Sequence, residues 1–136
     1  MRMLTNLLMA GALSILLIAC ETVPVTDRLH QIDTTLLALQ ETIPTLIETG
    51  DITQEDSDRL VSVLAKAREI NGRALDLSKI GQAVDAAETT RDVIDILHAV
   101  RDEISNESIK QDVGRVIALL TLTRSIIEQE AADETI

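Results

Sequence analysis

The sequence contains no phenylalanine, tyrosine or tryptophan, the side chains on which single-stranded nucleic acids usually stack. Basic residues are also scarce: 12 stand against 23 acidic ones, for a formal net charge of −11 and a pI of about 4.4. Because proteins bind the phosphate backbone mainly through lysine and arginine, this charge balance excludes nucleic acid as a partner.

Cysteine occurs once, at Cys20, so the chain cannot form an intramolecular disulfide. The 136 residues suffice for one small domain, and 46% of them are hydrophobic. That share of hydrophobic residues is enough to bury a core, and it argues against disorder throughout the chain despite the acidity.

The N-terminus carries Arg2 and then an apolar run from Leu7 to Ala19. A helix that crosses a bilayer needs roughly 20 apolar residues, whereas the hydrophobic part of a secretory signal needs only about 7–15 behind a positive charge. The run from Leu7 to Ala19 has the length of the hydrophobic part of a secretory signal. Residues 1–19 are therefore predicted to be a signal peptide that is removed from the mature protein.

The run ends in Leu17-Ile18-Ala19-Cys20, which resembles the lipobox of bacterial lipoprotein precursors. The resemblance implies that the Cys20 thiol receives diacylglycerol, that the chain is cut between Ala19 and Cys20, and that the new amino group is acylated, for example with palmitate. The residue types suit this chemistry, since Ala19 is small enough to enter a protease site and Cys20 supplies a soft nucleophile.

Three acyl chains on Cys20 would hold the protein on the bilayer permanently, because each buried methylene contributes about 0.8 kcal/mol. Residue 21 is Glu and not Asp, which resembles the pattern for export to the outer membrane in lipoproteins of enterobacteria. We therefore expect the protein on the outer membrane, facing the periplasm. Residues 20–25 would form the lipidated N-terminus and a short tether.

Residues 26–130 are predicted to be all-α, because apolar residues recur at alternating spacings of three and four and no segment sustains a period of two. The pattern indicates a small antiparallel bundle of about four helices, or coiled-coil hairpins that assemble, followed by a flexible tail over 131–136. The first apolar stripe comprises Val25, Leu29, Ile32, Leu36, Leu39, Ile43 and Leu46.

Three further stripes follow. The second comprises Leu60, Val63, Ala67, Ile70, Ala74, Leu77, Gly81 and Val84. The third comprises Val93, Ile96, Leu97, Val100 and Ile104, and the last Ile109, Val113, Val116, Ile117, Leu120 and Ile127. Small residues in the second stripe bury little area, and without aromatic residues the core is modest, so self-association is expected.

Several residues predict where helices end. Pro44 should kink the first helix or end it near Ile43, Gly50 suits a left-handed turn, and Thr53 can cap the next helix. Ser108 with Gln111 forms a capping box for the last helix.

The second stripe passes through Gly72 without losing register and allows two interpretations. One helix could run from about Thr53 to Glu88, or a break at Gly72 could precede a third helix from about Leu77 to Ile104. We favour the break, because four segments of similar length bury one another better than a helix of about 35 residues would.

Catalytic and metal-binding patterns are weak. His30 and Asp33, like Asp95 and His98, are three residues apart, but bundle metal sites use Glu-x-x-His and additional Glu ligands. The cluster Glu55, Asp56 and Asp58 lacks EF-hand spacing and suits the start of a helix, where negative charge is stabilised. We expect no enzyme activity, metal, cofactor or small-molecule substrate.

The function predicted from the sequence is a structural or adaptor role, in which an anchored helical surface binds a protein partner or a second copy. The small murein lipoproteins are similar in style, but they end in a lysine joined to peptidoglycan, and this chain ends Asp133-Glu134-Thr135-Ile136. The alternative is a resemblance to the outer-membrane subunit of a phage spanin, which acts in host lysis. Such subunits are often proline-rich, and this chain has only Pro24 and Pro44.

Overall fold

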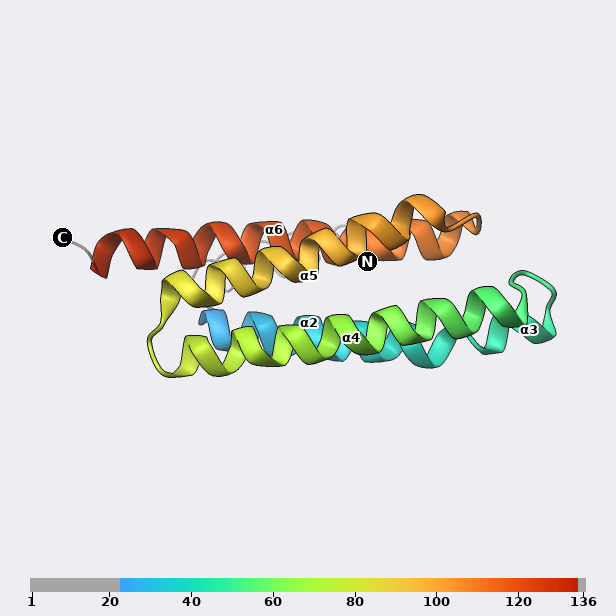
Figure 1. Ribbon diagram of the computed structural model, residues 1–136, viewed down its shortest axis with the longest axis horizontal. Coiled ribbons are helices and arrows are strands. Elements are labelled where there is room, and N and C mark those ends of the chain that lie inside the picture. The colour runs from blue at the N-terminus through green and yellow to red at the C-terminus, as the bar shows by residue number, and fades with distance from the viewer. Residues whose placement is uncertain (1–22, 135–136) are drawn as a thin grey trace, which may run out of the picture.

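The computed structural model describes residues 23–134, which form an up-and-down bundle of four long helices (Figure 1). These are α2 (Val25–Thr42), α4 (Gln54–Lys79), α5 (Ala83–Glu103) and α6 (Glu107–Glu134), with a short helix α3 (Thr45–Glu48) after α2. The described residues contain no strand. The prediction of a small all-α bundle is therefore confirmed.

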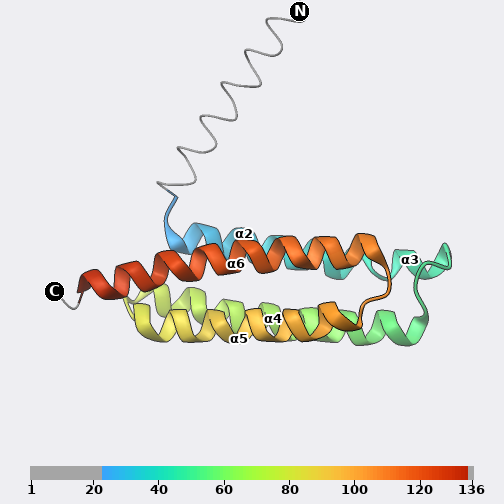
Figure 2. The ribbon, with the colours of Figure 1, turned by 90° about the horizontal axis from the view of Figure 1, so that it is seen from above.

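Each long helix packs against two others. α2 and α5 both contact α4 and α6, so α2 lies diagonally opposite α5, and α4 diagonally opposite α6. Seen from above, α2 and α6 run side by side along one side of the bundle and α4 and α5 along the other (Figure 2). The α2–α6 contact is sparser than the other three.

The core confirms most of the predicted stripes. Every predicted position of the first and last stripes is buried except Leu46, which is half-buried. In the third stripe Ile96 is half-buried and Ile94 is buried beside Leu97. The N-terminal half of α5 adds small core residues that the stripe did not include, namely Ala83, Ala86, Ala87 and Thr90.

The second stripe is partly wrong. Leu60, Ala67, Ile70 and Ala74 are buried as predicted, but Leu64 takes the place of Val63, which is only half-buried, and Leu77 is also half-buried. Gly81 and Val84 are exposed. Gly81 and Val84 leave the core because the stripe assumed one continuous register, whereas the chain turns between α4 and α5 at residues 80–82.

The favoured break at Gly72 is wrong, and so is the longer helix to Glu88. α4 continues through Gly72 to Lys79, and the chain turns at Gly81, which has a φ of 76°. The Gly81 N–H bonds to the Ser78 carbonyl at 3.2 Å and the Gln82 N–H to the Leu77 carbonyl at 2.9 Å. These bonds close the last turn of α4, the role that glycine plays after a helix end.

The first two helix ends match their predictions. α2 ends at Thr42, directly before Ile43 and Pro44, and Gly50 has a φ of 77° in the following turn. The Thr53 hydroxyl accepts a hydrogen bond from the Asp56 N–H at 3.1 Å and so caps α4.

The predicted capping box at Ser108 and Gln111 is wrong, because the cap lies two residues earlier. The Asn106 side chain accepts a hydrogen bond from the Ile109 N–H at 3.1 Å, and α6 begins at Glu107. The helix also continues to Glu134, into the segment expected as a tail, since Ala131 packs against the core half-buried.

Candidate interaction surface

The predicted lipidation and cleavage residues, Leu17, Ile18, Ala19 and Cys20, lie outside the described residues, as does the whole predicted signal peptide. Within residues 23–134, no helix is both long enough and apolar enough to cross a bilayer. The surface of the bundle is therefore the part of the molecule in which a functional site can be sought.

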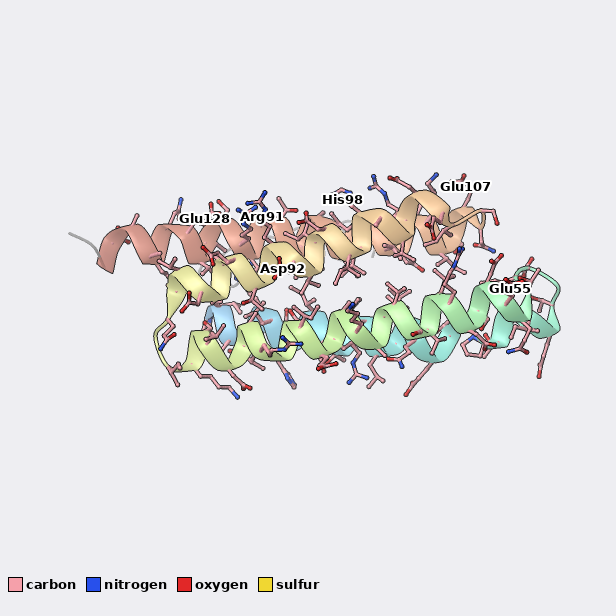
Figure 3. All side chains as sticks on the ribbon, viewed as in Figure 1. Glu55, Arg91, Asp92, His98, Glu107 and Glu128 are labelled. Atoms are coloured by element: carbon pink, nitrogen blue, oxygen red, sulfur yellow. The ribbon has the colours of Figure 1, made fainter. Side chains whose placement is uncertain are left out.

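The two histidine–aspartate pairs are not brought together. His30 lies on α2 and His98 on α5, which are diagonally opposite helices, and both side chains are exposed. Figure 3 labels His98. Asp33 is engaged elsewhere, since its carboxylate accepts a hydrogen bond from Arg68 Nε at 3.0 Å. The arrangement offers no shared metal position.

The acidic residues Glu55, Asp56 and Asp58 lie in the first turns of α4. Glu55 is labelled in Figure 3, at the end of the bundle that α3 occupies in Figure 1. Asp56 pairs with Arg59 at 3.6 Å, and Asp58 accepts a hydrogen bond from Gln54 Nε2 at 2.9 Å. Local partners and the helix N-terminus thus stabilise their charge. In the described part of the chain, no group of three or more His, Cys, Asp or Glu side chains is placed to hold a metal ion.

Hydrogen bonds and an ion pair join α2 to α4. Arg68 on α4 binds Asp33 and also donates from Nη1 to Gln40 Oε1 at 3.3 Å. In the core, Asn71 Nδ2 donates to the Leu29 carbonyl at 2.9 Å. On the other side of α4, Arg59 pairs with Glu103 of α5 at 3.1 Å. These contacts fix α4 between α2 and α5.

The side of the bundle formed by α2 and α6 has a groove and exposed apolar side chains. A groove of about 130 Å³ runs between the two helices, lined by Arg28, Gln31, Ile32, Thr35, Leu119 and Thr123. Leu119 is 47% exposed and Leu122, one turn further along α6, is 51% exposed. Two large apolar side chains therefore reach solvent beside a shallow groove.

Acidic side chains are missing from the middle of this side. α6 has none between Asp112 and Glu128, and α2 has none between Asp33 and Glu41. By helical spacing, Ala38 continues the row of Gln31 and Thr35, and Ile126 continues the row of Leu119 and Leu122. We call the groove residues together with Ala38, Leu122 and Ile126 the α2–α6 face.

The opposite side, formed by α4 and α5, carries charges along its length. Exposed acidic residues recur on it from Glu55 and Asp58 to Glu69, Asp76, Asp85, Glu88, Asp92, Asp95, Asp102 and Glu103. Basic residues accompany them, so α4 and α5 together carry 11 acidic and 7 basic residues, against 9 and 4 on α2 and α6. What distinguishes the middle of the α2–α6 face is the absence of carboxylates, and Arg28 is the charged residue that lines its groove.

Two other exposed apolar residues, Ile80 and Val84, lie at the α4–α5 turn. This turn is at the end of the bundle where α2 begins (Figures 1 and 2). Near it, between α5 and α6, an open hollow is lined by Glu88, Arg91, Arg124 and Glu128 among others, and Arg124 pairs with Glu128 at 3.0 Å. The hollow thus contains charges of both signs.

The sequence patterns did not include Leu119 or Leu122 as functional residues. The signal available was the segment 116–122, in which five of seven residues are Val, Ile or Leu. One helix face cannot bury so dense a run, so some of these side chains must lie outside the core stripe.

Comparison of the chain with protein-family models, with curated proteins and with solved structures gives no significant match.

Proposed function

We propose that this protein is a membrane-anchored periplasmic lipoprotein with a non-catalytic, structural or adaptor role through helix-mediated protein–protein contact. The observation that carries the proposal is the α2–α6 face, where two half-exposed leucines lie beside a groove on a surface whose middle has no carboxylate. Exposed apolar groups that gather on a polar protein favour a contact surface.

The anchor follows from Cys20 and its lipobox. Val25, the first residue of α2, lies five positions after Cys20, and a fully extended segment of five steps spans about 17 Å. Lipidation would therefore hold the start of α2 close to the bilayer. The Glu21 pattern supports the outer membrane as its location.

The acidic surface supports binding in preference to catalysis. Asp33, Asp56, Glu103 and Glu128 each pair with an arginine, and both histidines are exposed on separate helices. Such charges solubilise a bundle and suppress unwanted association. The middle of the α2–α6 face, which has no carboxylate, is where a partner can approach.

The anchor is tested by Cys20→Ala in the native host, with Thr22→Ala as the matched control. We expect the Cys20→Ala protein to keep residues 1–19, because the lipid-dependent cleavage needs the thiol, and the control to be processed. Mass spectrometry of the N-terminal peptide and partition into detergent report the result. Cleavage of the Cys20→Ala protein, or an unmodified Cys20 in the unaltered protein, contradicts the anchor.

A further inference from the structure

We propose that the α4–α5 turn inserts its two exposed apolar side chains, Ile80 and Val84, into the surface of the membrane that anchors Cys20. The proposal rests on the lipid anchor of the proposed function and goes beyond it, because it gives the bundle one orientation on the bilayer. Its evidence is the exposure of the two side chains, the charge of the turn and its position relative to the start of α2.

The two side chains are unusually exposed for their size. Ile80 is 68% exposed and Val84 is 56% exposed, the highest values among the large apolar side chains that the structure describes. Ile80 directly follows α4, and Val84 is the second residue of α5. Removal of such groups from water is favourable, and exposed apolar groups that gather at one place mark a contact with a protein or a membrane.

The charge of the turn permits entry into a bilayer surface. The five residues 80–84 contain no charged side chain, and the nearest charges are Lys79 and Asp85, one on each side. Residues 73–85 contain two basic and two acidic residues and so carry no net charge. Because ionised side chains are costly to bring into the membrane, an uncharged apolar turn is a segment that can enter it.

The acidic end of α6 lies at the same end of the bundle but at another corner. Val84 and Ala131 line the same hollow, and the exposed carboxylates Glu130 and Asp133 lie beside Ala131 in the sequence. α6 is diagonally opposite α4, the helix that ends at the turn. A bundle that touches the membrane with its α4 corner therefore keeps these carboxylates in water.

The register of α2 against α4 places the turn beyond the start of α2. Asn71 Nδ2 donates to the Leu29 carbonyl, so these two residues lie at the same level. Val25 is four residues before Leu29, which is about 6 Å at 1.5 Å per residue. Ile80 is nine residues after Asn71, or about 14 Å in the same direction, because the two helices are antiparallel. The turn thus reaches about 8 Å further than α2 does.

This position brings the turn to the anchored bilayer. The turn and the start of α2 lie at the same end of the bundle (Figures 1 and 2). The five steps from Cys20 to Val25 span at most about 17 Å. A tether at about half of that extension therefore holds Ile80 at the level of the membrane surface.

The anchor also makes a small apolar contact sufficient. Two side chains bind a bilayer weakly by themselves, but a tether of a few residues gives them a high effective concentration at its surface. The long axis of the bundle then leads away from the membrane, with α3 at the far end (Figure 1). The α2–α6 face runs along this axis and stays accessible to a partner protein.

The test uses the full-length protein, purified from its host with its lipid and reconstituted into phosphatidylcholine vesicles. Because the chain has no aromatic residue, one introduced tryptophan reports a single position. Gln82→Trp places this reporter in the turn, and Ala65→Trp is the matched control, exposed on α4 about 22 Å before Ile80.

We expect phosphatidylcholine brominated on its acyl chains to quench the fluorescence of Gln82→Trp and to leave that of Ala65→Trp unchanged. Equal quenching of the two proteins overturns the proposal. An unquenched Gln82→Trp also overturns it, and leaves Ile80 and Val84 to a protein partner.

A second set of variants separates the native side chains from the reporter, because tryptophan itself favours a membrane interface. Gln82→Trp is combined with Ile80→Ser and Val84→Ser, or with Leu119→Ser and Leu122→Ser as the matched control on α6. We expect the first pair to lower the ratio of inserted to free turn about tenfold, which corresponds to about 1.4 kcal/mol. The control pair should leave the quenching unchanged. Equal quenching in both pairs, with intact helices by circular dichroism, contradicts the proposal.

Mass spectrometry of the N-terminal peptide in the same samples separates the two proposals. A lipidated Cys20 with an unquenched Gln82→Trp overturns the contact of the turn and leaves the anchor standing. An unmodified Cys20 overturns the anchor, and with it the contact, because the contact depends on the anchor.

Discussion

At the scale of single residues, Asn71 is the polar side chain that matters most to the core. It is fully buried, and Nδ2 donates to the Leu29 carbonyl at 2.9 Å, while Oδ1 is buried without a hydrogen-bond partner in the structure. A half-satisfied amide stabilises less than a fully bonded one. Its directional bond nevertheless fixes how far α4 is shifted along α2, as a single polar core residue does in coiled coils.

We therefore expect Asn71→Asp to destabilise the fold much more than Asn71→Ala does. The aspartate keeps the shape but loses the donor and places a charge in the core, at a cost of about 3 kcal/mol in the free energy of unfolding. The alanine loses one hydrogen bond and leaves a small cavity, at about 1–2 kcal/mol. Urea unfolding at pH 7 measures both values.

The pH dependence of the two variants provides the control. The buried aspartate is disfavoured only when ionised, so its destabilisation is fully present above the folded-state pKa, which burial raises, and disappears as the pH falls to about 4. The Asn71→Ala loss should not change over this range relative to the unaltered protein. Equal losses for both variants at pH 7 would contradict this account of the core.

At the scale of helices, two glycines in the α4–α5 region have opposite effects. Gly81 has a φ of 76°, whereas Gly72 lies inside α4, and a Cβ added there would meet no atom within 4 Å. Gly81→Ala should lower the free energy of unfolding by about 1 kcal/mol because of backbone strain. Gly72→Ala should raise it by about 0.5–1 kcal/mol, since alanine favours a helix interior.

Thermal unfolding of the two glycine variants, followed by circular dichroism, measures the difference. The pair is matched in chemical change, so the sign of the shift in Tm depends on backbone conformation alone. A lower Tm for Gly72→Ala than for Gly81→Ala would show that α4 ends where the sequence pattern favoured, and not at Lys79.

The same two glycines show which part of the fold could not be predicted from the sequence. Leu and Ile at regular spacings were enough to assign the core of α2 and α6, because large side chains leave few alternatives for burial. Either Gly72 or Gly81 could follow the end of a helix, so the sequence does not decide between them. Ala67 and Ala74 are small, so they do not show which face of the helix must be buried. The end of α4 is decided by the length of helix that its neighbours cover, which is a tertiary property.

The α2–α6 face could not be predicted from the sequence, for a related reason. Whether Leu119 points into the core or out of it depends on where α2 lies relative to α6, and no local pattern contains that information. The opposite holds for Thr53, whose cap depends only on residues within one turn and was predicted correctly.

At the scale of the whole molecule, the excess of acidic residues opposes folding through repulsion between like charges. Salt shortens the range of this repulsion, from about 30 Å at 0.01 M to about 3 Å at 1 M. We expect the Tm to rise by about 4 °C between low salt and about 0.5 M NaCl, equivalent to roughly 1 kcal/mol of stability. Differential scanning calorimetry measures the shift.

A variant with Glu88, Asp92 and Asp95 changed to the corresponding amides is the control, because these exposed residues follow one another along α5. It should begin with a higher Tm at low salt and gain less from added salt. A Tm that falls with salt would mean that ion pairs such as Arg68–Asp33 outweigh the repulsion.

The sparse contact between α2 and α6 also has a consequence for how the chain folds. α4 follows α2, α5 follows α4 and α6 follows α5, so three of the four helix contacts join neighbours in sequence and form quickly. The fourth joins the first and last of these helices. During synthesis α2 can therefore pack against α4 first, whereas its contact with α6 can form only after the last helix has been made.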